Sequence, residues 1–156
     1  MAAHEIVPGL WIGNKESSMD RDFLGKAKIT SVFNCTKNLP FEPSIKRQFR
    51  VPLDDNLEPE EIRNMELWAM EIAYKIITEL GRAREKGEGV LVHCHAGMQR
   101  SAGSVAIYLI ATQGLTTDQA VAFIRKKRPI AFKPQVNFEK AIRGFEAAFE
   151  RVRPVG

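Results

Sequence analysis

Four residues that could together bind a phosphate and attack it with a thiolate lie within a short stretch of the chain, shortly after an apolar run. Cys94 follows Val90–Val92, and Gly97, Arg100 and Ser101 come shortly after it. A thiolate is a strong nucleophile, and a planar guanidinium can hold two phosphate oxygens at once. The residue types and their spacing therefore indicate an anion-binding loop that carries a cysteine nucleophile.

The elements on either side of this loop would position it. Val90–Val92 has the length and β-branched content of a buried parallel strand, and residues 101–111 are small and apolar on nearly every side, which is typical of a buried helix. A tight strand–loop–helix junction turns backbone N–H groups inward and aims a helix N-terminus at the same point. We expect these groups and Arg100 to favour the thiolate form of Cys94.

The other residues of the loop fit the same chemistry. Gly97 permits a positive φ or a close approach of the backbone. Ser101 could donate a hydrogen bond to the sulfur and help it to leave in a second chemical step. A single cysteine after a strand is more often a core thiol, but the addition of Gly97, Arg100 and Ser101 at this spacing favours a catalytic loop over a core position.

The motif resembles the signature of the cysteine-dependent protein phosphatases. It consists of His93, Cys94, five further residues, Arg100 and Ser101. The Ala-Gly pair at 96–97 and the Ser-Ala pair at 101–102 most resemble the dual-specificity branch of that family. Gln99 departs from the branch, which usually carries a serine there, and we expect this change to affect the shape of the loop rather than its activity.

The resemblance implies hydrolysis in two steps through a cysteinyl-phosphate intermediate. In this mechanism Cys94 attacks phosphorus, Arg100 and the backbone amides of the loop bind the non-bridging oxygens, and His93 has a supporting role. The predicted substrate-binding residues are His95, Ala96, Gly97, Met98, Gln99 and Arg100. No metal ion or other cofactor is expected.

The mechanism also needs a general acid for the leaving oxygen. The stretch from Val51 to Asn56 resembles the acid loop of the family, in which the second acidic position is catalytic. Asp55 is therefore the predicted acid, and Asp54 is the alternative.

Strand patterns alternate with helical patterns along the rest of the chain. This order predicts one α/β domain over residues 1–156, with a central mainly parallel sheet of about four to five strands and helices on both faces. We expect strands at 4–14, in two parts, at 29–35, at 49–53 and at 90–92. Ser17 or Ser18 is expected to cap a short helix. Further helices are expected from 58 to 86, over 101–111, after Thr116 and from Pro134 onward.

Composition limits the possible partners. The chain has 156 residues, 44% of them hydrophobic, and a net charge of +4, which suits anionic substrates but is too small for a nucleic-acid-binding surface. No apolar run reaches ~18 residues and the start lacks a signal-peptide pattern, so we expect a cytoplasmic protein that does not bind membranes. The basic cluster at 125–128 leaves the nucleus as an alternative.

The cysteines and histidines do not indicate a metal site or a disulfide framework. Cys35 and Cys94 are the only cysteines, and Cys35 is expected to pack as a small hydrophobe, with resolution of an oxidised Cys94 as the minor alternative. His93 and His95 flank the cysteine, but zinc needs three or four converging ligands and the only other histidine is His4.

The expected substrate is a phosphorylated protein. The Trp-Pro-Asp loop and added segments of the larger tyrosine-specific relatives are missing, so a shallow pocket would admit phosphoserine and phosphothreonine as well as phosphotyrosine. Three alternatives stay open: a phosphoinositide phosphatase, which would predict lysines within 95–99; an RNA triphosphatase, whose motif differs at Gln99 and Ser101; and a phosphopeptide-binding module, which would usually lack the cysteine or the arginine. The sequence does not indicate the physiological substrate or the oligomeric state.

Overall fold

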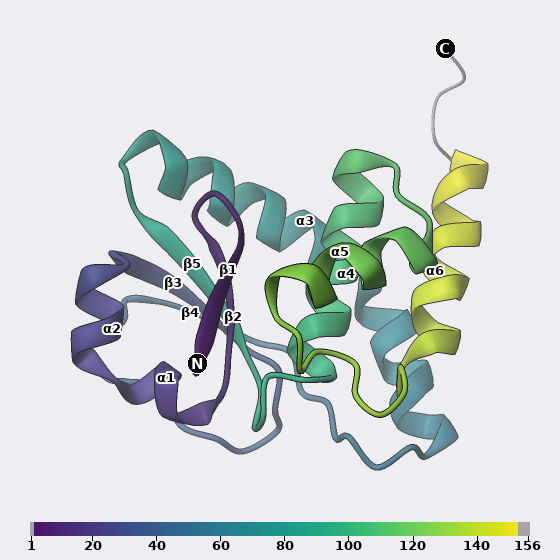
Figure 1. Ribbon diagram of the computed structural model, residues 1–156, viewed down its shortest axis with the longest axis horizontal. Coiled ribbons are helices and arrows are strands. Elements are labelled where there is room, and N and C mark those ends of the chain that lie inside the picture. The colour runs from purple at the N-terminus through teal and green to yellow at the C-terminus, as the bar shows by residue number, and fades with distance from the viewer. Residues whose placement is uncertain (1, 153–156) are drawn as a thin grey trace.

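A five-stranded sheet forms the centre of the molecule in the computed structural model, which describes residues 2–152 (Figure 1). The strands are β1 (Ala3–Val7), β2 (Leu10–Gly13), β3 (Ile29–Asn34), β4 (Arg47–Arg50) and β5 (Gly89–His93). Their order is β1-β2-β5-β3-β4, with β1 antiparallel to β2 and every other pair parallel. The predicted mainly parallel α/β sheet is therefore confirmed.

Helices cover both faces of this sheet. They are α1 (Lys15–Met19), α2 (Arg21–Lys26), α3 (Pro59–Glu85), α4 (Arg100–Gln113), α5 (Thr117–Lys127) and α6 (Glu139–Val152). The short helices α1 and α2 lie on one face, and α3 to α6 form a larger layer on the other (Figure 1). The two predicted helical layers are thus of very unequal size.

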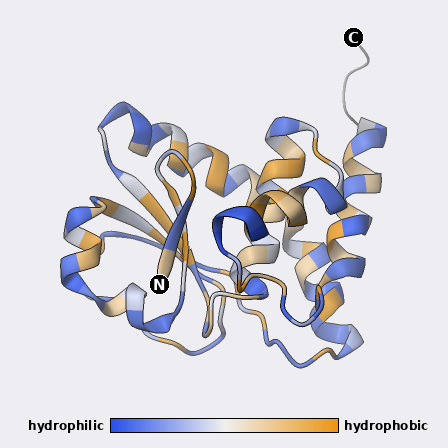
Figure 2. Ribbon diagram, in the orientation of Figure 1, coloured by the Kyte–Doolittle hydropathy of each residue, from blue (hydrophilic) through white to orange (hydrophobic). Residues whose placement is uncertain are grey.

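Alternate side chains of the strands point into two separate cores. Val32 and Leu91 pack with Leu24 of α2 on one face, whereas Val90 and Val92 join the larger core under α3 and α4. Ten consecutive residues of α4 are buried, and the helix is hydrophobic along much of its length, whereas the outer helix α6 alternates (Figure 2). The helix that follows β5 is therefore the central one, as the sequence predicts.

The parallel strands bring their carboxyl ends to one edge of the sheet. Gly13 at the end of β2 and Asn34 at the end of β3 are both in register with His93, the last residue of β5. Because β5 lies between β2 and β3, the residues that follow it are surrounded by backbone on both sides. In open α/β sheets this edge is where ligands bind, and Cys94 is the first residue beyond it.

The fourth strand and the first helix differ from expectation. The strand predicted at 49–53 is β4, which spans Arg47–Arg50, because its partner β3 ends at Asn34 and the ladder ends with it. It is an edge strand, as predicted from Pro52. The predicted serine cap is wrong: Asn14 accepts a hydrogen bond from Ser17 N and caps α1.

The start of the last helix also differs. Pro134 was expected to begin it, but α6 begins at Glu139. Residues 133–137 are held in a loop by hydrogen bonds to Gln99, which keeps them out of a helix. Other predicted signals are confirmed: Pro59 begins α3, and Thr116 with Gln119 forms a capping box on α5.

Candidate active site

The loop between β5 and α4 has all of its carbonyl groups occupied. The oxygens of residues 95–99 accept hydrogen bonds from Lys15 N (2.9 Å, to residue 95), Arg128 Nη2 (3.2 Å, to 96), Arg128 Nε (2.8 Å, to 97), Phe132 N (2.8 Å, to 98) and Gly103 N (2.7 Å, to 99). Within residues 2–152, no protein group accepts a hydrogen bond from the N–H groups of 95–99. A concave loop with occupied carbonyls and free N–H groups is an anion-binding site.

Gly97 allows the loop to lie against the end of β2. Its φ is +70°, and an added Cβ would lie 2.6 Å from the carbonyl oxygen of Gly13. A larger residue there would push the loop away from the sheet. Gly97 itself is buried, and it is the one predicted substrate-binding residue that does not line the cavity found above Cys94.

Cys94 lies beneath the free N–H groups and beside the start of α4. Its Sγ is 3.2 Å from Oγ of Ser101, which is fully buried in the first turn of that helix. The hydroxyl can donate to a thiolate, and the positive end of the helix dipole favours negative charge at the same point. The predicted pair of Cys94 and Ser101 is therefore brought together.

Arg100 reaches across to the acid loop. Its Nη1 donates to the carbonyl oxygen of Leu53 (3.0 Å), and its buried Nε has no hydrogen-bond partner among the described residues. A buried donor without a partner is costly unless a ligand completes it. An oxygen of a bound phosphate would supply that partner.

A cavity of about 220 Å³ opens above the cysteine. It is lined by Asp55, Cys94, His95, Ala96, Met98, Gln99, Arg100, Lys133 and Asn137. The nucleophile, the arginine and the predicted acid therefore share one cavity. Lys133 and Asn137 come from the loop before α6 and were not predicted to belong to the site.

The two candidate acids lie in different surroundings. Asp55 lines the cavity and accepts a hydrogen bond from Asn137 Nδ2 (2.9 Å). Asp54 does not line the cavity, and its carboxylate forms an ion pair with Lys37 (3.2 Å), which also binds the buried Glu61. The geometry favours Asp55 over Asp54 for proton transfer to a ligand in the cavity.

His93 is buried directly before the cysteine. Its Nδ1 lies 3.1 Å from the carbonyl oxygen of Cys94, and since a carbonyl can only accept, Nδ1 carries the proton. Burial lowers the pKa of His93 to about 4. The neutral ring holds the backbone at the nucleophile in place, which fits the predicted supporting role.

Arg128 is a further residue at the site that the sequence did not predict. It belongs to the basic run at the end of α5, yet it is fully buried and donates to two carbonyls of the loop between β5 and α4. We call this loop, residues 94–99, the phosphate loop. Its Nη1 also lies 2.8 Å from Nδ1 of His4. The cluster at 125–128 therefore does not present four accessible cations, which removes much of the basis for a nuclear signal.

Gln99 was predicted to affect the shape of the loop, and it links two segments. Its Nε2 donates to the carbonyls of Lys133 (3.1 Å) and Gln135 (2.7 Å), and its Oε1 accepts from the N–H of Asn137 (2.9 Å). The side chain of Asn137 in turn binds Asp55. Gln99 thus connects the phosphate loop to the residue that holds the candidate acid.

Cys35 is packed as expected. It is fully buried, its Sγ is 3.5 Å from Oγ of Ser104, and burial raises its pKa to about 12. A thiol with so high a pKa is a poor nucleophile at neutral pH. Within residues 2–152, no three His, Cys, Asp or Glu side chains lie close enough together to hold a metal ion.

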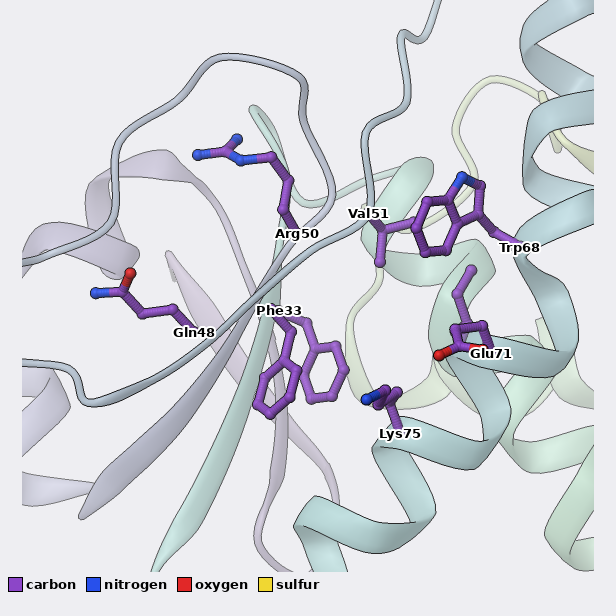
Figure 3. Close-up of a pocket in the computed structure, with 9 residues that line it drawn as sticks. Phe33, Gln48, Arg50, Val51, Trp68, Glu71 and Lys75 are labelled. Atoms are coloured by element: carbon purple, nitrogen blue, oxygen red, sulfur yellow. The ribbon is translucent and has the colours of Figure 1, made fainter.

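A second cavity lies away from the phosphate loop. It measures about 240 Å³ and lies between the β3–β4 edge of the sheet and α3. The stacked rings of Phe33 and Phe49 (4.7 Å between centroids) line it, and Figure 3 shows Lys75 on the side of Phe33 and Trp68 near Val51. No cysteine or histidine lines it, and it shares no residue with the cavity above Cys94. Cys94, Arg100 and Asp55 line only the smaller of these two cavities. Among the described residues, no helix has both the length and the apolar character needed to cross a bilayer.

Residues 10–148 match the family model of the dual specificity phosphatase catalytic domain. The chain is 31% identical to Dual specificity protein phosphatase Mpk3 of Drosophila melanogaster over 96% of its own length and 35% of that protein. The chain spans an even smaller share, 20%, of the human Dual specificity protein phosphatase 8.

Solved structures extend the likeness to the whole fold. Human DUSP28 superposes with a TM-score of 0.76 at 22% identity, covering 96% of each chain. The human tyrosine phosphatase-like serine/threonine/tyrosine-interacting protein superposes with a TM-score of 0.74 at 25% identity, covering 95% of this chain and 97% of that one. With the family model matching most of the chain and the signature loop folded around Cys94, the chain belongs to the family of dual-specificity phosphatase catalytic domains.

Proposed function

We propose that the chain hydrolyses phosphate monoesters of tyrosine, serine and threonine in proteins, through a covalent intermediate on Cys94. The observation that carries this proposal is the orientation of the loop, in which the carbonyls of 95–99 are bound on the outside and the N–H groups are left for an anion. A nucleophilic sulfur at the centre of such a loop is suited to attack on phosphorus.

In the first step the thiolate of Cys94 attacks phosphorus in line, so that an S–P bond forms as the bond to the leaving oxygen breaks. Arg100 and the loop N–H groups bind the three non-bridging oxygens throughout. Asp55 gives its proton to the leaving alkoxide or phenoxide. The dephosphorylated side chain departs and phosphocysteine remains.

In the second step the carboxylate of Asp55 takes a proton from water, whose oxygen attacks phosphorus. The S–P bond breaks, and Ser101 donates a hydrogen bond to the departing thiolate of Cys94. The products are inorganic phosphate and the free enzyme. No step calls on a cofactor, and every proton that moves has a donor and an acceptor in the cavity or in water.

Two observations support a broad phosphoprotein substrate class. Asp55 is exposed at the rim of the cavity. Phosphotyrosine could therefore reach the sulfur, and so could the shorter side chains of phosphoserine and phosphothreonine. The relatives Mpk3 and Dual specificity protein phosphatase 8 carry dual specificity in their names. We take a phosphorylated protein as the partner on these grounds.

One observation favours a second candidate, a phosphoinositide phosphatase. Lys133 lines the same cavity as Arg100 and could bind an additional phosphate group, although it lies outside residues 95–99, where a phosphoinositide phosphatase is expected to carry lysines. A lysine at a cavity rim also suits an acidic residue in a phosphopeptide, so it does not displace the first proposal.

The test is a phosphate-release assay with four substrates: a phosphotyrosine peptide, a phosphothreonine peptide, a phosphoinositide and a 5′-triphosphate RNA. We expect both peptides to be turned over, and the Cys94→Ser variant to turn over none. A phosphoinositide rate that exceeds both peptide rates and is lost in Lys133→Met would favour the second candidate. Binding of phosphopeptide without any turnover would instead indicate a binding module.

A further inference from the structure

Helix α3 exposes a row of large apolar side chains to solvent. Leu67, Met70, Tyr74 and Ile77 are 74%, 60%, 65% and 43% exposed, and we call these four residues the outer seam. They are four of the seven large apolar residues that are exposed among those described. Scattered exposed apolar residues are normal, whereas a contiguous row on one element indicates an interaction surface.

The outer seam is separate from the two faces of α3 that are already in use. Met65, Ala69 and Ile72 belong to the buried stripe that packs on the core. Trp68 and Lys75 turn toward β4 and line the groove between the helix and that strand (Figure 3). The helix therefore has a third face, on which the four apolar side chains are exposed. At its N-terminal end Leu67 and Arg63 border a hollow beside Lys140 of α6.

The spacing of the outer seam is that of a coiled coil. Its residues are separated by three, four and three positions, which corresponds to a, d, a and d of two successive heptads. In an antiparallel pair of helices each a position faces a d position. Leu67 would then face Ile77 of a second copy, and Met70 would face Tyr74 of that copy. The seam is thus complementary to its own reversed copy, as a two-fold interface requires.

Charged residues at the two ends of the seam agree with this register. Arg63 would face Gly81 of the second copy, where the absence of a side chain leaves room for the guanidinium to reach Glu85 one turn further on. Arg63 and Glu85 are both exposed, and neither forms an ion pair with another residue of the part that the structure describes. The two-fold axis would create this pair twice.

We propose that the protein forms an antiparallel homodimer through the outer seam of α3. A seam of two heptads is smaller than the ~800 Å² per partner of a standard interface, so we expect a dimer with a dissociation constant in the micromolar range. None of the residues that line the cavity above Cys94 belongs to α3. The cavity would stay open in the dimer, and each protomer should keep its activity.

Sedimentation velocity of the whole chain over a wide range of concentrations tests the proposal. We expect reversible dimerisation that is abolished by Ile77→Glu, because a carboxylate would be buried in the seam. The matched control is Met19→Glu on α1, since Met19 is 44% exposed and Ile77 is 43% exposed. A wild-type chain that stays monomeric at the highest concentration, or equal effects of the two variants, would overturn the proposal.

Charge reversal tests the register. Arg63→Glu and Glu85→Arg should each raise the dissociation constant roughly tenfold, since two pairs change together, and the double variant should restore it. A double variant that dimerises as weakly as the two single variants would contradict the antiparallel arrangement. Phosphate release per protomer from an aryl phosphate should be the same in all of these variants, which separates this test from that of the proposed function.

Discussion

Arg128→Met tests whether the buried guanidinium gives the phosphate loop its orientation. The guanidinium donates to the carbonyls of Ala96 and Gly97 at 3.2 and 2.8 Å. Methionine is close to arginine in length and fills the same space, but it cannot donate a hydrogen bond. The substitution therefore removes the donors while leaving the packing largely intact.

The expected effect follows from these two bonds. A hydrogen bond from a charged group contributes ~1.5–3 kcal/mol to stability, and the removed charge also ends its own desolvation cost, so a net loss of about 2–4 kcal/mol in the free energy of unfolding is expected. The two carbonyls would become free to turn inward, where they would repel an anion. Because loss of one oxyanion donor costs ~10²–10³-fold in rate, we expect kcat/KM to fall by about 10²-fold.

The assay is competitive inhibition by inorganic phosphate, measured against an activated aryl phosphate. Arg128→Met should raise the inhibition constant by at least about tenfold, in parallel with kcat/KM. Arg125→Met is the matched control, since Arg125 donates to the carbonyls of Ala131 and Phe132 and not to the phosphate loop. It should change the inhibition constant by less than about threefold.

A second readout comes from the histidine that contacts Arg128. Burial and the guanidinium hold the pKa of His4 below its ordinary value, so removal of the charge should raise it in an NMR titration. If Arg128→Met is folded and binds phosphate as the wild type does, the orientation of the loop does not depend on Arg128.

Three further predictions concern His93, the acid loop and the cysteines. Burial holds the pKa of His93 at about 4 against ~6.5 when unfolded, so the unfolded chain binds more protons and stability should fall by about 2 kcal/mol between pH 7 and 5 in urea denaturation, a slope that His93→Asn should flatten. Asp55→Asn should slow phosphopeptide turnover ~10²–10⁴-fold while sparing an activated aryl phosphate; the same selectivity in Asp54→Asn would instead identify Asp54 as the acid. Iodoacetate should modify Cys94 and not Cys35, with protection by phosphate, and equal labelling would contradict an activated Cys94.

Much of the site could be predicted because its parts are local in sequence. The apolar run before Cys94, the small residues after Ser101 and the spacing of Arg100 between them all lie within one strand–loop–helix unit, where periodicity and motif spacing are informative. The same holds for the capping box at Thr116. Motifs of this kind can be recognised from neighbouring residues alone, without knowledge of the tertiary fold.

The residues that support the site could not be predicted in this way. Arg128 belongs to a run of cations, and only the packing of α5 against the loop buries it. Gln99 and Asn137 bind across 38 positions of sequence, and these bonds hold the segment that was expected to begin the last helix at Pro134. Such contacts depend on the assembled fold, so a sequence pattern gives no direct sign of them.

Trapping the covalent intermediate shows whether the phosphoryl group passes through Cys94. In Ser101→Ala the departing sulfur loses the hydrogen bond seen at 3.2 Å, so breakdown should slow and phosphocysteine should accumulate. Acid quench during turnover of an aryl phosphate, followed by peptide mass spectrometry, should find one phosphoryl group on the peptide that contains Cys94, and none in Cys94→Ser. A phosphoryl group on His95 or Cys35, or turnover by Cys94→Ser, would contradict the account.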